Sequence, residues 1–258
     1  MSSPSRPHWS LIDVAGHPCE LHAPPGAMPG RAVVYLHDLD GRTPSQLDAV
    51  RAAFEAAALP VVAPRTGRSW WLDRAMPGFG DGSTPERFVC HTIVADIAAR
   101  FGVRPPGIAL LGCGMGGQGA LRLAYRHPGV FPIAAAVAPA IDFHLGMRQA
   151  AERDDGELFD TLWQTFGDVE RARQDTAILH VHPLNWPRQH WFASSPDDVF
   201  WHDGAARLRS KLVALGIPHE AVLEAAPGEG QGAFERRMAG AAVAFVVAAL
   251  DREARRIG

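Results

Sequence analysis

Short apolar segments alternate with longer amphipathic segments along most of the chain. Continuous apolar runs predict strands that are buried on both faces, and they fall at 32–36, 60–63, 108–111, 133–137, 190–194 and 221–224. Apolar residues at helical spacing predict helices at 46–58, 85–101, 115–127, 205–215 and 235–255. This alternation predicts an α/β fold with a mostly parallel sheet and helices on both faces, and we expect one domain over residues 1–258.

Two segments interrupt the alternation. Residues 142–187 are largely polar, and we expect them to form an insertion or cap over the ligand site. Residues 67–83 form a long loop rich in Gly and Pro, and such loops often carry binding residues. Trp70, Trp71 and Trp186 in these segments are candidates to line an aromatic pocket, with core packing as the alternative for each.

The composition narrows the classes of partner. The formal net charge of −3 gives no electrostatic reason to expect nucleic acid or an anionic membrane. The longest apolar run, 241–250, is too short to span a bilayer. The three cysteines do not suggest a disulfide framework, and the N-terminal residues lack the apolar core of a signal peptide. We therefore expect a cytoplasmic protein.

The segment Gly112-Cys113-Gly114-Met115-Gly116-Gly117 lies between a predicted strand and a predicted helix. This is the context of a nucleophile elbow, whose pattern is Gly-x-Ser-x-Gly. The segment resembles the Gly-x-Ser-Met-Gly-Gly elbow of bacterial esterases in the α/β-hydrolase superfamily. The resemblance covers nearly the whole chain, and it implies an α/β-hydrolase fold and an esterase-like site.

Gly114 stands at the nucleophile position, so the serine of the family is lost and no acyl-enzyme can form there. Glycine readily adopts the strained backbone of an elbow. Cys113 is the only thiol nearby, but the side chain before the nucleophile points back toward the sheet in this geometry. We therefore expect a structural cysteine, and keep Cys113 as a pocket candidate.

The resemblance also assigns the other triad positions, because chain order in this fold is Ser, then Asp or Glu, then His. The acid follows the strand 190–194, where Asp198 is the first choice and Asp197 the second, with one of them capping the next helix. The histidine belongs in the loop before the last helix, where Gln231 stands instead. Glutamine cannot take up a proton at neutral pH, so the general base is lost as well.

The oxyanion hole is expected to survive. The backbone N–H groups of Met115 and Leu39 match the two donor positions of the family. The loop after the first predicted parallel strand begins His37-Asp38, where the family has His-Gly, and the aspartate puts the local backbone shape in question. We expect a binding site for an oxyanion or a small carboxylate here, with His37 and Asp38 among the lining residues.

Other sites are disfavoured. His182 lies in a group of histidines with His180, His190 and His202, but no carboxylate or cysteine completes a ligand set, so we expect no metal and keep His182 as a pocket candidate. The glycine-rich turn lacks the Gly-Lys-Ser/Thr ending of a phosphate-binding loop. It matches the dinucleotide pattern, yet the next predicted strand ends without an acidic residue to hold a ribose, so we expect no cofactor.

Three hypotheses for function follow. The first is a pseudoenzyme that binds an ester, acyl or carboxylate ligand, or another protein, without triad turnover; a second copy of the chain is another candidate partner. The second is an ester hydrolase that works through another group, such as water held by Asp198 or His182 entering the pocket. The third is an ordinary serine esterase in which residue 114 was altered artificially, against which Gln231 argues.

Overall fold

The computed structural model describes residues 9–27, 29–76, 79, 82–152 and 155–257. In this described part of the chain, eight strands form one sheet in the order β1-β2-β4-β3-β5-β6-β7-β8. The strands are β1 Trp9–Val14, β2 His17–His22, β3 Ala32–Leu36, β4 Val61–Pro64, β5 Ile108–Cys113, β6 Ile133–Val137, β7 Gln189–Ala193 and β8 Glu220–Val222. The pairings β1–β2 and β2–β4 are antiparallel and the other five are parallel, which confirms the predicted mostly parallel α/β sheet.

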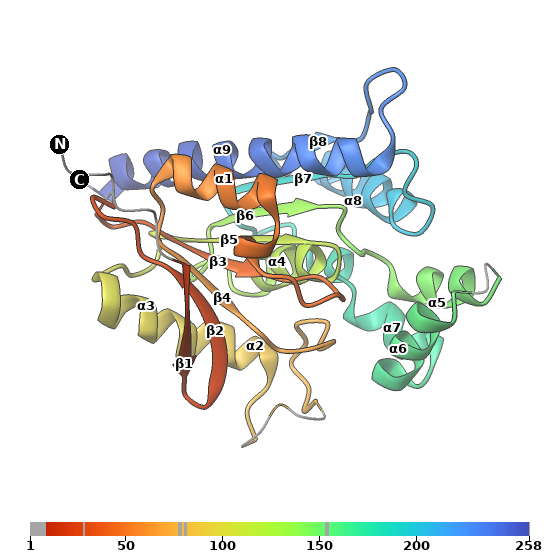
Figure 1. Ribbon diagram of the computed structural model, residues 1–258. Coiled ribbons are helices and arrows are strands. Elements are labelled where there is room, and N and C mark those ends of the chain that lie inside the picture. The colour runs from red at the N-terminus through yellow and green to blue at the C-terminus, as the bar shows by residue number, and fades with distance from the viewer. Residues whose placement is uncertain (1–8, 28, 77–78, 80–81, 153–154, 258) are drawn as a thin grey trace.

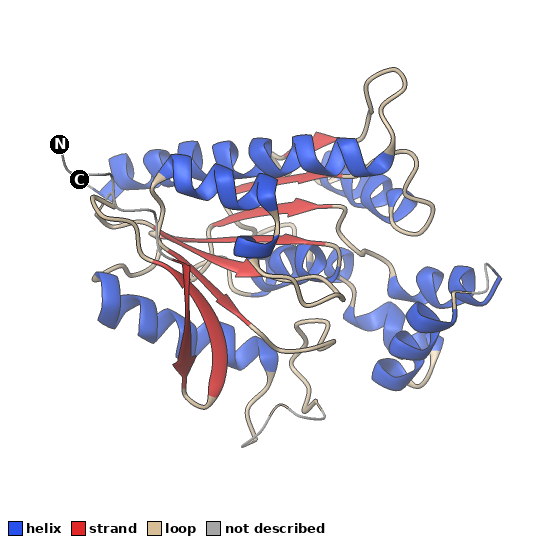
Figure 2. Ribbon diagram, viewed as in Figure 1, coloured by secondary structure: helices blue, strands red, loops and turns tan. Residues whose placement is uncertain are grey.

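Helices cover both faces of the sheet (Figures 1 and 2). One face packs against α1 (Asp48–Ala57) and α9 (Gln231–Ile257). The other packs against α3 (Val94–Phe101), α4 (Met115–Arg126) and α8 (His202–Ala214). All five residues of β3 are buried, as are all five of β6. Burial of both faces explains why these strands appear in the sequence as continuous apolar runs.

All of the predicted strands and helices are present, with shifts at their ends. The predicted helix 85–101 contains three pieces, which are α2 (Pro85–Arg87), a π-helix (Phe88–Ile93) and α3. The hairpin β1–β2 was not predicted, because it lies at the sheet edge and its strands mix exposed, half-buried and buried residues. The predicted helix 46–58 corresponds to α1, and a 3-10 helix (Pro44–Gln46) precedes α1.

Three further helices lie between β6 and β7, in the segment predicted to be an insertion. They are α5 (Phe143–Glu152), α6 (Gly156–Phe166) and α7 (Val169–Asp175), followed by a 3-10 helix (Ala177–His180). Figure 1 shows them beside the carboxyl ends of the parallel strands. The Thr176 hydroxyl accepts from the Asp142 N–H at 2.8 Å, and the Gln118 side chain on α4 accepts from the Ala177 N–H at 2.8 Å. These bonds join the two ends of the segment and attach it to α4.

A buried ion network links α2, α4 and the end of α7. The carboxylate of Glu86, which is 3 % exposed, accepts hydrogen bonds from Arg122, from Arg126 at 2.8 Å and from His127 at 2.7 Å. Burial alone would raise the pKa of Glu86, but the hydrogen bond from His127 and the two guanidinium groups lower it to about 2. Arg122, which is 2 % exposed, also donates to the Asp175 carbonyl at 3.1 Å. The network therefore holds α7 against α4.

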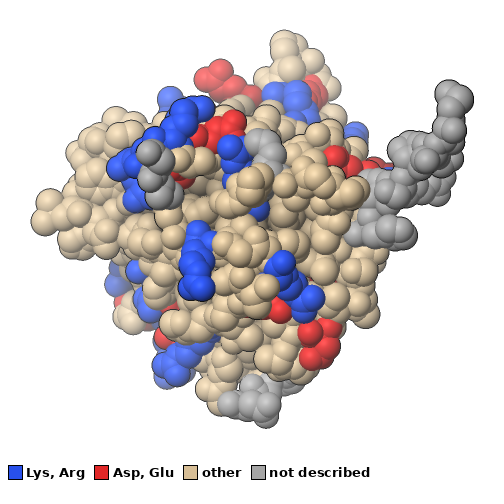
Figure 3. Space-filling view, turned by 90° about the vertical axis from the view of Figure 1, so that its left-hand side faces the viewer, with Lys and Arg blue, Asp and Glu red and all other residues tan. Residues whose placement is uncertain are grey.

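No helix among the described residues is long and apolar enough to cross a membrane. Figure 3 views the molecule from the left-hand side of Figure 1, away from α5, α6 and α7. Acidic and basic side chains are interspersed on this face, and neither sign covers it.

The buried network predicts a large effect of one substitution. Glu86→Gln removes the closest counter-ion of the buried Arg122 and leaves it with Asp175 Oδ1 at 3.5 Å, and we expect it to lower the free energy of unfolding by about 3 kcal/mol. The matched control is Glu170→Gln, which removes a carboxylate from the exposed Glu170–Arg173 pair and should leave the melting temperature unchanged. Urea denaturation of both variants measures the difference, and equal stability of the two would contradict the structural role of Glu86.

Candidate active site at the turn between β5 and α4

Gly114 forms the sharp turn between β5 and α4, with φ 52° and ψ −117°. A residue with a Cβ is strained in this region. The flanking glycines are needed for a different reason, which is close packing. A Cβ on Gly112 would overlap the Gly116 backbone, and a Cβ on Gly116 would overlap the Leu36 carbonyl at the end of β3. The strand–helix turn therefore has the geometry that the Gly-x-x-x-Gly spacing predicted.

His37 fixes the loop that follows β3. The Thr66 N–H donates to His37 Nε2 at 3.1 Å, so the ring proton is on Nδ1, which donates to the Asp38 carbonyl at 2.8 Å. Burial lowers the pKa of His37, and the ring is therefore neutral at pH 7. Trp71 Nε1–H donates to the His37 carbonyl at 3.2 Å. His37 is thus a buried structural residue that orients the loop and not a group facing the ligand.

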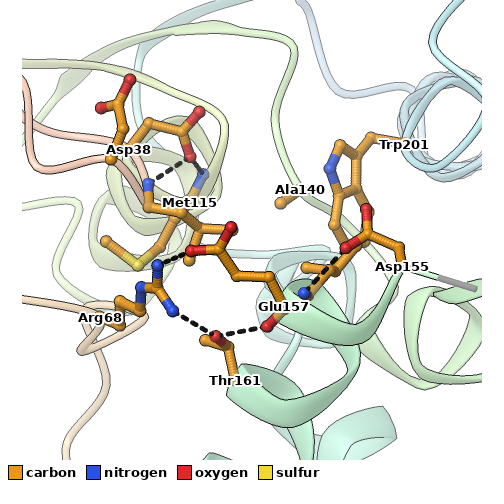
Figure 4. A pocket seen from close by; sticks show the side chains of 11 residues that line it. Asp38, Arg68, Met115, Ala140, Asp155, Glu157, Thr161 and Trp201 are labelled. Carbon is orange, nitrogen blue, oxygen red and sulfur yellow. Dashed lines mark hydrogen bonds and ion pairs between the residues drawn. The ribbon is translucent and has the colours of Figure 1, made fainter.

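The carboxylate of Asp38 occupies the centre of the site. Its Oδ1 accepts from the Leu39 N–H at 2.7 Å and from the Met115 N–H at 2.8 Å (Figure 4). A Cβ built on Gly114 would overlap the carboxyl carbon and both carboxyl oxygens of Asp38. The same carboxylate therefore fills the space of a residue-114 side chain and engages both N–H groups predicted for the oxyanion hole.

The predicted donors are thus brought together, but they are not free. In this arrangement both N–H groups donate to Asp38 Oδ1, and the binding of an external oxyanion or carboxylate stays a prediction. Burial raises the pKa of Asp38, the hydrogen bonds from Met115 and Leu39 lower it in part, and the charges of Asp40 and Glu235 raise it further.

Asp198 takes the buried place at the acid position. It is 4 % exposed, whereas Asp197 is exposed. Its Oδ1 accepts from the Trp201 N–H at 3.0 Å and from the Phe200 N–H at 3.2 Å, just before α8. Its Oδ2 has no hydrogen-bond partner among the described residues. Burial raises the pKa of Asp198 to about 6, against which the two N–H bonds act.

Gln231 is bonded through its side chain to its own helix. It is the first residue of α9, it is exposed, and its Nε2 donates to Glu235 Oε1 at 2.9 Å. Glu235 lies one turn further along α9, and its charge raises the pKa values of Asp38, Cys113 and Asp198. Sequence reasoning missed Glu235, although its spacing of four residues from Gln231 places both on one side of the helix.

Two cavities adjoin Asp38. One of about 250 Å³ is lined by Asp38, Leu39, Asp40, Arg68, Met115, Ala140, Asp155, Glu157, Leu158, Thr161 and Trp201. We call it the cap-side cavity, because α6 and its N-cap residue Asp155 contribute four of these residues. The other, of about 380 Å³, lies between the loop after β3 and α9, and its lining includes Tyr35, Asp38, Cys113 and Glu235.

Several predicted pocket residues lie elsewhere. Trp70 and Trp71 are fully buried in the core, and the Trp71 side chain packs against Gly119 on α4. His182 and Trp186 precede β7, so they lie at the amino ends of the parallel strands, opposite Gly114. His182 is exposed there. These four residues are not in the lining of either cavity beside Asp38.

Cys113 does line the larger cavity. Burial and the charge of Asp38 raise the pKa of its thiol to about 12, so the thiol is protonated at neutral pH. Among the described residues, no group of three His, Cys, Asp or Glu side chains is arranged to hold a metal ion.

The structure adds residues that no sequence pattern indicated. Arg68, in the loop after β4, pairs with Glu157 on α6 and donates to Thr161 Oγ1 at 3.2 Å (Figure 4). Arg68 and Glu157 are 89 positions apart. Only tertiary packing brings such distant residues together, so their pairing leaves no local signal in the sequence.

The order of strands and the turn after β5 define an α/β-hydrolase fold, and solved structures of that fold agree. FphF, a fluorophosphonate-binding serine hydrolase of Staphylococcus aureus, matches with a TM-score of 0.71 and 12% identity over 94% of this chain and 99% of its own. An S-formylglutathione hydrolase from Agrobacterium tumefaciens matches with a TM-score of 0.63 and 17% identity over 97% and 94%. Mycobacterium tuberculosis MPT51 (FbpC1) matches with a TM-score of 0.62 and 19% identity over 96% and 100%.

The family follows from the sequence. The family described as "Putative esterase" matches residues 21–211, and the chain therefore belongs to this esterase family. A comparison with curated protein sequences gave no match. The expected α/β-hydrolase fold and the esterase resemblance are confirmed.

The overlap between residue 114 and Asp38 predicts that their effects on stability are coupled. Gly114→Ala should displace the Asp38 carboxylate from two backbone N–H groups and add backbone strain, which together cost about 2–5 kcal/mol. In a chain that also carries Asp38→Gly, the same change should cost only the strain, about 1–3 kcal/mol.

A double-mutant cycle by urea denaturation measures this coupling. Gly129→Ala is the control, because a Cβ there meets nothing within 4 Å, and its effect should add to that of Asp38→Gly. Additive effects of Gly114→Ala and Asp38→Gly would show that the carboxylate does not occupy the space beside residue 114.

The raised pKa of Asp198 predicts that replacing it with Asn increases the stability of the protein in a pH-dependent way. Its pKa is about 6 in the folded chain against an ordinary 3.8, so the folded state retains a proton that the unfolded state loses between about pH 4 and 6. The free energy of unfolding therefore falls as the pH rises through this window. Asp198→Asn keeps the acceptor oxygen and removes this loss, so its stability relative to wild type should be higher at pH 7.5 than at pH 4.5 by roughly 1–3 kcal/mol. A difference that is the same at both pH values would refute this.

Proposed function

We propose that this member of the esterase family is a ligand-binding protein that does not hydrolyse esters through a Ser-His-Asp triad. One observation carries the proposal: the Asp38 carboxylate fills the position of the nucleophile side chain and engages the N–H groups of Leu39 and Met115. An ester carbonyl needs both N–H groups to stabilise its developing negative charge. A negatively charged carboxylate in that place opposes the transition state.

The substitutions at positions 38 and 114 complement each other. Glycine at 114 makes room for the Asp38 carboxylate, and a serine there would overlap it. If Gly at 114 had replaced a native Ser artificially, the rest of the site would still fit a serine, and no aspartate would point into its place. The paired arrangement therefore supports a natural glycine and disfavours the hypothesis of an altered esterase.

The hypothesis of hydrolysis by another group has less support. Hydrolysis at neutral pH needs a nucleophile and a base within hydrogen-bond reach of each other. The Cys113 thiol is held protonated, and His182 lies at the other end of the sheet. Asp198 Oδ1 is engaged by two backbone N–H groups before α8. In serine hydrolases, loss of the nucleophile alone lowers turnover by about a million-fold.

The cap-side cavity is the place where we propose that a ligand binds. Residues 142–187 act as its cap, because Asp155, Glu157, Leu158 and Thr161 line it from above the strand ends. Its other wall is the turn at Met115 and the loop at Leu39, which is where the substrate of an esterase of this fold lies. The protein thus retains a pocket whose chemistry has been replaced.

The proposal predicts that the wild-type chain hydrolyses p-nitrophenyl acetate and butyrate no faster than buffer, and that a fluorophosphonate probe does not label it. The variant Asp38→Gly/Gly114→Ser/Gln231→His removes the carboxylate and restores the two missing groups. We expect the probe to label this variant at residue 114.

The matched control is Asp38→Gly/Gly114→Ala/Gln231→His, which differs by one oxygen and should not be labelled. Wild-type hydrolysis well above background that is lost in Asp38→Asn or Asp198→Asn would overturn the proposed function, because it would assign catalysis to a carboxylate.

A further inference from the structure

The base of the cap-side cavity presents an acceptor carboxylate and two backbone donors that are already bonded to it. Both backbone N–H groups at its base donate to Asp38 Oδ1, so they are unavailable to a ligand oxygen. Asp38 Oδ2 accepts no hydrogen bond from any described residue, and it remains as an acceptor beside the cavity. A site that in esterases donates hydrogen bonds to an oxyanion thus offers a negatively charged acceptor here.

The charged side chains around the cavity also favour a cation over an anion. Its described lining contains four carboxylates, Asp38, Asp40, Asp155 and Glu157, and one guanidinium, Arg68. Asp40 pairs with Arg42, and Glu157 pairs with Arg68, which also donates to Thr161. Asp38 and Asp155 remain without a cationic partner among the described residues. Asp155 uses only Oδ1, which accepts from the Leu158 N–H at 3.0 Å.

The rest of the lining is apolar and includes an aromatic ring. Leu39, Met115, Ala140 and Leu158 line the cavity together with Asp38 and Asp155. The indole of Trp201 forms a further part of the wall, and Figure 4 shows it on the side of Asp155, with Asp38 on the opposite side. An indole face attracts cations as well as apolar groups. At about 250 Å³, the cavity is smaller than the usual pocket for a drug-sized ligand.

We propose that the cap-side cavity binds a small organic ammonium ion with an apolar body, whose N–H groups donate to Asp38 and whose body lies against Trp201. This proposal rests on the proposed function, since it names the class of ligand for the same site. It replaces the sequence-based expectation of an ester or carboxylate ligand. A carboxylate would meet Asp38 and Asp155 without a free donor, whereas an ammonium ion compensates their charge.

Isothermal titration calorimetry at pH 7.5 tests this with three shape-matched probes, the cation benzylamine, the neutral benzyl alcohol and the anion benzoate. Methylammonium and phenethylamine extend the series in size. We expect at least one of the ammonium ions to bind at about millimolar affinity or better, and benzoate not to bind. Asp38→Asn and Asp155→Asn should each weaken the ammonium ion at least about tenfold.

Asp13→Asn is the control for net charge, because Asp13 is exposed on β1 at the far edge of the sheet. Its affinity should stay within about twofold of wild type. Circular dichroism and melting temperature establish that each variant is folded, and the two cavity variants provide separate tests if one of them is not.

The ligand class is overturned if benzoate binds as tightly as the ammonium ions, if none of the ammonium ions binds below about 10 mM, or if binding is equal in wild type and both cavity variants. The hydrolysis assay separates this failure from that of the proposed function. A wild-type chain that neither hydrolyses esters nor binds ammonium ions loses only the ligand class, whereas one that binds them and hydrolyses esters loses only the non-catalytic function.

Discussion

Two hydrogen bonds to one carboxylate oxygen hold the candidate site together. The Asp38 side chain joins the loop after β3, through the Leu39 N–H, to the start of α4, through the Met115 N–H. Asp38 and Met115 are 77 positions apart, and each of the two N–H groups is a strong donor that needs a partner when it is buried. In an active esterase, water or substrate provides that partner. Here the chain provides it, and the Asp38 carboxylate fills the centre of the site.

This arrangement depends on glycines around it. Gly112 and Gly116 let the backbones of β5, α4 and the end of β3 approach so closely that the two donors converge. Gly114 then leaves the volume that the carboxylate occupies. The scaffold of an esterase is therefore retained in full, because the packing of strand, turn and helix does not require the serine hydroxyl. At its centre, a negatively charged carboxylate stands where an esterase has a neutral serine hydroxyl.

The acidic side chains at the site lower the stability of the fold. Burial raises the pKa values of Asp38 and Asp198, which means that the folded state disfavours their charged forms, and Glu235 adds a third carboxylate nearby. Residues that lower stability are tolerated where they serve a site. By contrast, the buried Glu86 near the other end of α4 is paired with two arginines and accepts a further hydrogen bond from His127. Asp38 and Asp155 instead lie beside the cavity where we propose that a cation binds.

The sequence by itself determined the six parallel strands, the helices of both layers and the elbow at Gly114, because buried strands, amphipathic helices and a glycine turn each leave a local pattern. The family resemblance indicated Asp198 as the first choice for the acid position and Asp197 as the second, and the structure buries Asp198 and exposes Asp197. The sequence did not reveal the edge hairpin or the helices between β6 and β7, whose polar and apolar residues alternate less clearly. Three features appear only in the tertiary structure: Asp38 accepts from the N–H groups of Leu39 and Met115, Trp70 and Trp71 lie in the core, and Arg68 meets Glu157. These depend on the direction of side chains from distant segments, which no local pattern encodes.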